Sequence, residues 1–308
     1  MTLLHLRVVC PRELAEPAVD TLTATPGAVA IARAPVGPSA PDLDLVTADV
    51  AREAANAVLR QLDRLGVNEA GMITIDPVET ALGALARKAE DDAPGEPDDA
   101  VIWDELLTRT GGDSTLSATF LAFLVLATLL AAIGVVTDSQ ITIVGAMVVG
   151  PEFGPLAGIA VGIVRRRTNI ARRAAAALAA GFPAAIVITA LLALLARAVG
   201  LIDASNLSGH RETEFIYHPG WFSLITALVA GAAGMLSLTS SKSAALVGVF
   251  ISVTTVPAAG NAAVAGVLGN WHETWLSAAQ LGINLVGIVI AGALTLLLRG
   301  GIARQDVQ

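Results

Sequence analysis

A single carboxylate, Glu152, interrupts an apolar run from Ile141 to Val164 that is long enough to cross a bilayer. The pairs Gly150-Pro151 and Gly154-Pro155 flank it. Because proline lacks a backbone donor and disrupts the preceding helical turn, nearby carbonyls lose their helical partners. A carboxylate beside free carbonyls suits a proton, a cation or a polar solute. The structural alternative is a Glu152 that pairs with an arginine or a backbone amide, and the cost of an intramembrane charge favours the functional interpretation.

A second apolar run, Ala244–Leu268, carries hydroxyl and amide side chains around a proline. Its candidate site residues are Ser252, Thr254, Thr255, Pro257 and Asn261. Hydroxyl groups readily bond to their own helix, so a structural role is the stronger alternative for the Ser/Thr group. The Gly-to-Pro-to-Gly spacings of the two runs agree within one residue, which predicts a 3+3 inverted repeat with two broken helices. Chance similarity between two glycine-rich segments is the alternative.

Asp138 and Gln140 fall in a tight turn before the first of these runs. They are either an outer vestibule for the site or a turn with a helix cap. The histidines and acidic residues elsewhere lack the tight spacing of metal ligands, so we predict no metal site. Without a catalytic constellation or a cofactor motif, we also expect no cofactor and no enzyme activity.

The composition is that of an integral membrane protein. Of 308 residues, 54% are hydrophobic and 15% are charged, and the mean hydropathy is +0.69. A net charge of −8 argues against a nucleic-acid partner. The single cysteine, Cys10, excludes an intramolecular disulfide.

The candidate site requires apolar helices that position it, and six runs are long enough to serve as spans. They are Leu116–Val136, Ile141–Val164, Ala174–Val199, Trp221–Leu238, Ala244–Leu268 and Trp275–Leu298. Five arginines lie between the second and third spans, namely Arg165, Arg166, Arg167, Arg172 and Arg173. Because cytoplasmic loops are enriched in Lys and Arg, both termini are predicted to be cytoplasmic.

The first part of the chain has a different pattern. Leu4, Leu6 and Val8 alternate with more polar residues, as in a half-buried strand. The later patterns complete a β-α-β-β-α-β order, which predicts an α+β ferredoxin-like soluble domain. We therefore expect a cytoplasmic domain over residues 1–77, a helical and acidic connector over 78–113, a six-span membrane domain over 114–300 and a cytoplasmic tail over 301–308.

Two segments resemble a known family. Asp138-Ser-Gln followed by Val144-Gly-Ala-Met-Val-Val-Gly-Pro-Glu-Phe-Gly-Pro-Leu-Ala-Gly158 resembles the signature of the bacterial hydrophobic-domain proteins called domain of unknown function 389. The segment Ser252-Val-Thr-Thr-Val-Pro-Ala-Ala-Gly260 resembles that family's second proline-bearing span, although family members often carry a paired proline where this chain has Pro257-Ala258. The resemblance covers roughly residues 113–300; it implies the membrane architecture and supplies no activity.

Two functions fit these observations. The first is a secondary transporter or channel for a small ion or polar solute, with Glu152 as the coupling group. The second is a non-transporting oligomeric scaffold or signalling protein that uses its soluble domain for assembly or sensing. In either case we expect the lipid bilayer of a bacterial cytoplasmic membrane as a partner, together with a homo-oligomer, a dimer by preference.

Overall fold

The computed structural model describes residues 3–78, 80–93, 95, 100–208, 212–240 and 254–305, with the side chains at 109, 113, 214, 215 and 300–305 left out. Within these residues the chain divides into two units. The first holds the residues up to Leu106 together with Thr239, Ser240 and the residues from Arg299 onward. The second holds Leu107–Leu238 and continues from Thr254 to Leu298.

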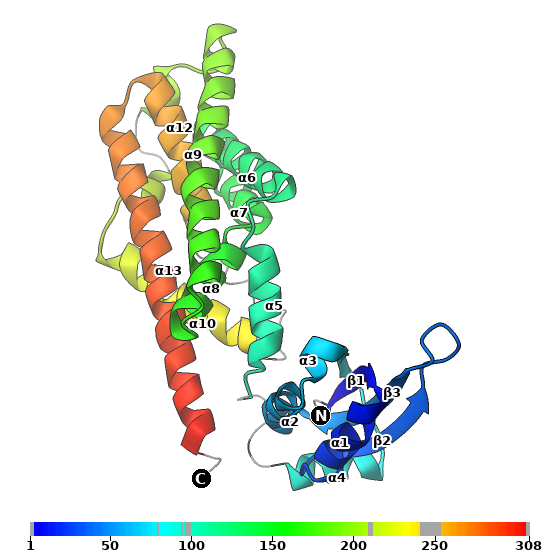
Figure 1. The fold of residues 1–308 in the computed structure, drawn as a ribbon. Helices are drawn as coiled ribbons and strands as arrows, with labels where there is room; N and C mark the ends of the chain where they lie inside the picture. Colours follow the sequence, from blue (N-terminus) through cyan, green and yellow to red (C-terminus); the bar gives the residue numbers. More distant parts are fainter. Residues whose placement is uncertain are drawn as a thin grey trace. The chain divides into compact units, whose positions relative to one another are not determined.

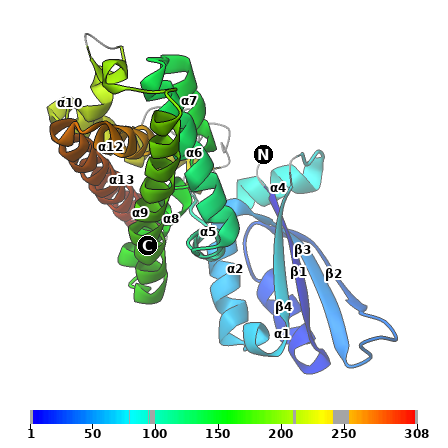
Figure 2. The ribbon, with the colours of Figure 1, turned by 90° about the horizontal axis from the view of Figure 1, so that it is seen from above.

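The first unit is built on a small antiparallel sheet (Figure 2). Its strands are β1 (Leu3–Pro11), β2 (Ala28–Pro35), β3 (Leu43–Ala51) and β4 (Met72–Val78), in the order β2-β3-β1-β4. Its helices are α1 (Arg12–Thr23), α2 (Arg52–Arg64), α3 (Val67–Ala70) and α4 (Ala84–Asp92), followed by α5 (Trp103–Asp113), which continues into the second unit. The central strands β1 and β3 therefore carry the hydrogen bonds that hold this unit together.

Alternation along β1 divides the sheet into a buried and an open face. Leu4, Leu6 and Val8 are buried, as their alternation predicts, whereas Arg7 is exposed. The buried residues share one apolar cluster with α1 and α2, including Leu22 and Leu62. This face excludes water, and the burial of these side chains stabilises the unit by the hydrophobic effect.

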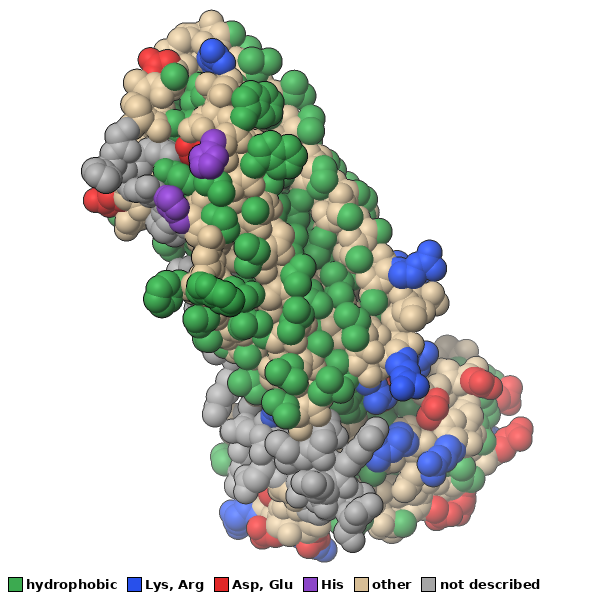
Figure 3. Space-filling model, turned by 90° about the vertical axis from the view of Figure 1, so that its left-hand side faces the viewer, with side chains coloured by type: hydrophobic (Ala, Val, Ile, Leu, Met, Phe, Trp, Pro, Cys, Tyr) green, Lys and Arg blue, Asp and Glu red, His purple; other side chains and the backbone are tan. Residues whose placement is uncertain are grey.

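The second unit consists of helices (Figure 1). They are α6 (Ala118–Val136), α7 (Gln140–Val149), α8 (Phe153–Val164), α9 (Thr168–Ala198), α10 (Trp221–Thr239), α12 (Thr255–Leu268) and α13 (Trp271–Gln305), with short 3-10 turns η2 (Ala204–Leu207) and η3 (Glu214–Tyr217). Four of them, α6, α9, α10 and α13, are long and apolar enough to cross a membrane, and α7 with α8 makes a fifth if that bent pair is one span. Hydrophobic side chains spread over the face of these helices in Figure 3, as a membrane protein requires.

The count of six spans stays a prediction. The predicted fifth span begins within residues 241–253, which lie outside the described residues, and α12 alone is 14 residues long. One boundary differs plainly: the arginines at 172 and 173, expected between spans, lie inside α9, which begins at Thr168. Arginine is a good helix former, so the helix continues through them before the apolar segment starts.

Helix α12 lies at the centre of the second unit. Every residue from Thr255 to Ala265 is buried, and the helix contacts α6, α9 and α7. A Cβ placed on Gly260 would lie 2.7 Å from the Cβ of Ala131 and 2.8 Å from the amide nitrogen of Ala132 in α6. Glycine at this position therefore allows two helix backbones to approach closely.

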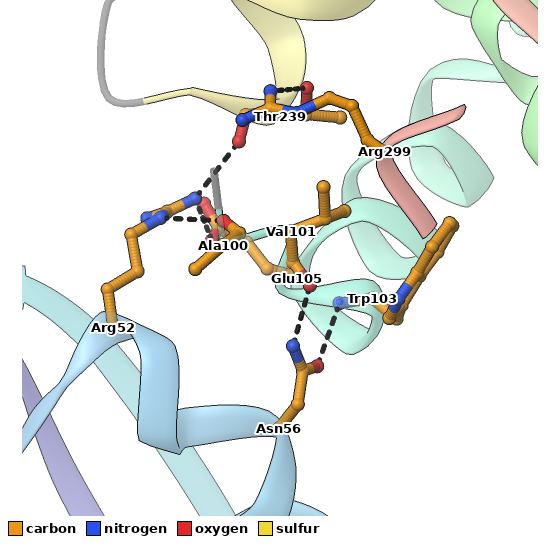
Figure 4. A network of polar contacts seen from close by, with 8 residues as sticks. All are labelled: Arg52, Asn56, Ala100, Val101, Trp103, Glu105, Thr239 and Arg299. Carbon is orange, nitrogen blue, oxygen red and sulfur yellow. Dashed lines mark hydrogen bonds and ion pairs between the residues drawn. The ribbon is translucent and has the colours of Figure 1, made fainter. Parts of the chain in front are cut away.

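A polar network connects α2 with Thr239, the last residue of α10, and with Arg299 in α13 (Figure 4). Arg52 Nε donates to the Ala100 carbonyl at 3.1 Å, and Arg52 Nη2 donates to the Thr239 carbonyl at 3.4 Å. Arg299 Nη1 donates to Thr239 Oγ1 at 2.6 Å. All four residues belong to the first unit, so the end of α10 and a residue near the end of α13 are part of the same unit as the sheet.

Candidate functional site

The interruption between α7 and α8 is the local feature that shapes the site. The two helices are bent by 51° where residues 150–152 separate them. Pro151 has no amide to continue α7, and Pro155 occupies the first turn of α8, where a missing amide costs little. A Cβ on Gly150 would collide with the carboxylate of Glu152 and approach Val256 to 2.9 Å. Glycine and proline thus bend the chain here and leave room for the acid.

Glu152 is almost fully buried at this bend, with 8% of its surface exposed. Its Oε1 accepts a hydrogen bond of 2.5 Å from the hydroxyl of Thr255, the first residue of α12. Its Oε2 has no hydrogen-bond partner among the described residues. Among the described residues Glu152 takes part in no ion pair, and the partner of its carboxylate is the Thr255 hydroxyl rather than an arginine.

Two helices begin beside this carboxylate. Glu152 immediately precedes α8, and Thr255 begins α12. A negative charge near a helix N-terminus is favourable by about 0.3–1 kcal/mol, because the first amides are unpaired. This arrangement offsets part of the cost of burying the acid.

The start of α12 resembles the start of α8 in detail. Pro155 and Pro257 are each the third residue of their helix, and Gly158 and Gly260 are each the sixth. Both glycines lie against another segment of the second unit: a Cβ on Gly158 would collide with the Ser114 side chain, as one on Gly260 would with α6. The two helices therefore share a proline and a glycine at matching positions, and the inverted repeat stays a prediction.

Thr254 begins a second polar cluster next to the first. Its hydroxyl oxygen accepts hydrogen bonds from Asn284 Nδ2 at 3.0 Å and from Gln280 Nε2 at 3.3 Å, both from α13. Gln280 Nε2 also lies 3.4 Å from Asn284 Oδ1. Because Thr254 and Thr255 are adjacent, this cluster adjoins the Glu152 carboxylate.

Asn261 forms a third cluster further along α12. Its Nδ2 donates to Glu273 Oε1 at 3.0 Å and to Ser277 Oγ at 2.8 Å. Glu273 also accepts from Asn270 Nδ2 at 2.8 Å and is only 3% exposed. We name the three clusters together the polar row: Glu152, Thr254, Thr255, Asn261, Glu273, Ser277, Gln280 and Asn284.

The structure thus brings most of the predicted site residues to neighbouring places. Gly150, Pro151, Glu152 and Thr255 meet at the bend, Gly154 and Pro155 follow in the first turn of α8, and Thr254, Pro257 and Asn261 lie at or along α12. Ser252 lies outside the described residues. Sequence reasoning missed Glu273 and Ser277 as site residues. Their spacing with Gln280 and Asn284 on one helical face was the signal that could have found them.

Asp138 and Gln140 lie apart from the polar row in their contacts. Asp138 accepts hydrogen bonds from the amides of Glu212 and Thr213 at 3.2 and 3.1 Å and from the Thr213 hydroxyl at 2.8 Å. Gln140 Nε2 donates to the Glu212 carbonyl at 3.2 Å. These contacts hold the segment before η3 against the α6–α7 turn, and the vestibule stays a prediction.

A separate hollow of about 490 Å³ lies at the turn between α8 and α9. It is lined by Leu107, Thr108, Arg166, Arg167, Thr168, Asn169 and Ile170, and it shares no residue with the polar row. Among the described residues, no group of three or more His, Cys, Asp or Glu side chains is arranged to hold a metal ion.

Comparison with known proteins finds a family model that is similar to part of the chain. Residues 147–290 match the family model described as domain of unknown function (DUF389), so the predicted resemblance is confirmed over this segment. The chain is also 27% identical over 220 residues to an uncharacterized protein of Methanocaldococcus jannaschii, an alignment that covers 66% of this chain and 63% of that protein. The chain therefore spans less than two thirds of the length of this curated relative. No solved structure matches the chain.

Proposed function

We propose that this chain is a membrane transport protein, a secondary transporter or channel for a small ion or polar solute, with its site at the bend that carries Glu152. The observation that carries the proposal is Glu152 Oε2, a buried carboxylate oxygen without a hydrogen-bond partner among the described residues. Leaving such an oxygen unsatisfied costs about 1–3 kcal/mol or more. An ion, a proton or a polar solute that visits the site would satisfy it.

The finer architecture belongs to the same proposal. The sheet order β2-β3-β1-β4 and the chain order of its strands and helices support a ferredoxin-like soluble domain. The matching proline and glycine positions in α8 and α12 support a 3+3 inverted repeat of six spans. We further propose a cytoplasmic membrane location with both termini inside, and a homodimer.

The proposal is tested by flux in proteoliposomes that contain the purified chain. Glu152→Gln keeps the shape of the side chain and removes its charge, and we expect it to abolish ion- or pH-dependent flux. Thr255→Val removes the one hydroxyl that bonds to Glu152 and should reduce flux about tenfold, which corresponds to about 1.4 kcal/mol.

The matched control is Thr189→Val. Thr189 in α9 also has a fully buried hydroxyl, but that hydroxyl makes no hydrogen bond to any described residue, and so none to the polar row. This variant makes the same chemical change at equal burial, so flux should stay at the wild-type rate. Wild-type flux in Glu152→Gln would contradict the proposed site.

A second candidate, a non-transporting scaffold, is favoured by close helix packing. A Cβ on Gly231 in α10 would lie 2.6 Å from the Ile288 carbonyl oxygen, and one on Gly292 would lie 3.2 Å from the Met235 side chain. Small residues at such contacts hold helices in one arrangement. A water-inaccessible Glu152 combined with no flux for any tested solute would support this function instead.

A further inference from the structure

One face of α13 is polar although the helix as a whole is apolar. Glu273, Ser277, Gln280 and Asn284 follow one another at spacings of four, three and four residues, which places them on one side of the helix. All four are buried. The rise of 1.5 Å per residue spreads them over about 16 Å along α13. A stripe of this length reaches from the start of the helix to the level of Thr254.

The polar row has more oxygen atoms that can accept hydrogen bonds than donors to fill them. Both amide protons of Asn261 are directed to Glu273 and Ser277, and the Gln280 amide is directed to Thr254 and Asn284. Asn261 Oδ1 and Gln280 Oε1 remain, like Glu152 Oε2, without a hydrogen-bond partner among the described residues. Both residues are at most 2% exposed. Three buried oxygens with free lone pairs are therefore spaced along the polar row.

The chemistry of the polar row selects a positive charge. Its residues include two carboxylates and no lysine, arginine or histidine. Carboxylate and amide oxygens are ligands for hard cations, and they repel anions. A Ca²⁺ site takes six to eight oxygens, often with several carboxylates. The polar row, by contrast, has a single carboxylate at each end, Glu273 and Glu152. A single positive charge matches one carboxylate at a time.

We propose that the polar row is a binding path for a small monovalent cation, which passes between Glu273 at the start of α13 and Glu152 at the bend. This inference rests on the proposed function, because it names the species that the transporter would carry. Asn261 Oδ1 and Gln280 Oε1 replace part of the ion's water shell between the two carboxylates. The row thus offers successive oxygens rather than one closed cage.

The test measures cation binding separately from transport. The purified full-length chain in detergent is heated in lithium, sodium or potassium chloride, with choline chloride at the same ionic strength as the control. Choline has the same charge but is too large for oxygens that strip a small ion of water. A ligand that binds only the folded state raises the unfolding midpoint with its concentration, and we expect at least one alkali cation to do so in a saturable way.

Three variants connect this binding to the polar row. Glu273→Gln removes one terminal charge, and Asn261→Leu and Gln280→Met each remove one free oxygen at similar side-chain volume. Each should weaken the apparent cation affinity about tenfold or more. Glu212→Gln is the matched control, because Glu212 is exposed and bonds to Gln140 and Asp138 through its backbone carbonyl and amide. The cation affinity of this variant should stay at the wild-type value.

The outcomes separate the two proposals. Equal stabilisation by choline, or wild-type affinity in all three variants, would overturn the cation path. If those variants also transport normally while Glu152→Gln does not, the proposed function stands without this path. If the wild-type chain binds alkali cations through Glu273 and Asn261 but moves neither these cations nor any other tested solute across a bilayer, the polar row stands as a binding site and the transport function fails.

Discussion

Two almost fully buried carboxylates, one in each unit, have opposite surroundings. Asp44 in β3 is 6% exposed, and Glu152 at the bend is 8% exposed. Asp44 Oδ2 lies 2.7 Å from Arg33 Nη2, and its Oδ1 lies 3.4 Å from Arg12 Nε. Glu152 has the Thr255 hydroxyl on one oxygen and no hydrogen-bond partner among the described residues on the other.

The difference is the reason for proposing a structural role for Asp44 and a functional role for Glu152. A buried charge is tolerated when it is paired and hydrogen-bonded, and the two arginines complete the surroundings of Asp44. The second oxygen of Glu152 has no such partner among the described residues, and the proposed ion or solute would supply one. The exposed fraction alone therefore does not separate a structural carboxylate from a candidate site carboxylate, whereas the atoms bonded to it do.

The largest expected effect comes from neutralising each of these two carboxylates, which should reduce stability at Asp44 and transport at Glu152. Asp44→Asn should lower the unfolding midpoint of the sheet by about 5–10 °C, because it removes the charge that bonds to Arg33 and forms an ion pair with Arg12. Glu152→Gln should abolish flux and leave the midpoint unchanged or higher, since it removes an unpaired buried charge. Circular dichroism melts and proteoliposome flux on both variants measure this. A Glu152→Gln chain that unfolds at a much lower temperature would make Glu152 a structural acid too.

A smaller effect is expected from displacing α12 without touching any polar atom. Gly260→Ala places a Cβ 2.7–2.9 Å from Ala131, Ala132 and the Thr128 carbonyl oxygen, so it should cost about 1–3 kcal/mol and reduce flux. Gly145→Ala in α7 is the control, because a Cβ there meets nothing within 4 Å. Alanine exceeds glycine in helix propensity by up to about 1 kcal/mol, so this variant should be neutral or slightly more stable. Equal unfolding midpoints for the two variants would show that α12 does not hold the polar row in place.

The bend between α7 and α8 can be predicted from the sequence, whereas the contacts around the bend cannot. Gly150, Pro151 and the buried acid are local features, and local chemistry suffices to predict an interrupted helix there. The partner of Glu152 is Thr255, which lies 103 positions later in the chain. Only the packing of α12 decides which of several hydroxyls reaches the acid, and no local pattern encodes that choice.

Glu273 shows a second limit. At the start of an apolar run, beside Trp271 and Trp275, it has the position of an interface residue, and only its spacing with Ser277 and Gln280 indicates a buried face. In the sheet, by contrast, the alternation of Leu4, Leu6 and Val8 directly predicts burial, because a period of two leaves one choice of face. Whether a polar residue in an apolar helix is buried depends on its partners on other helices, whereas the buried face of this sheet follows from the alternation within one strand.

The smallest expected effect is a shift in the pKa of the Cys10 thiol, which lies next to Asp44 in the sheet. Cys10 is paired with Asp44 across β1 and β3. Burial, reinforced by the Asp44 charge, raises the pKa of the Cys10 thiol above its ordinary value, and Arg33 opposes this shift. The folded chain therefore keeps the proton at pH values where the unfolded chain begins to lose it. This group's contribution to stability is present below the pKa of the unfolded chain and is lost as the pH rises through the folded pKa.

Alkylation measures this directly, since Cys10 is the only cysteine in the chain. The rate of reaction with iodoacetamide should rise with pH, and its midpoint should lie at a higher pH in the folded chain than in denaturant. Glu152→Gln, the control, should leave the folded midpoint unchanged. A folded midpoint at a lower pH than in denaturant would mean that Arg33 outweighs burial and the Asp44 charge, and that the pairing around Asp44 leaves a net positive potential at the thiol.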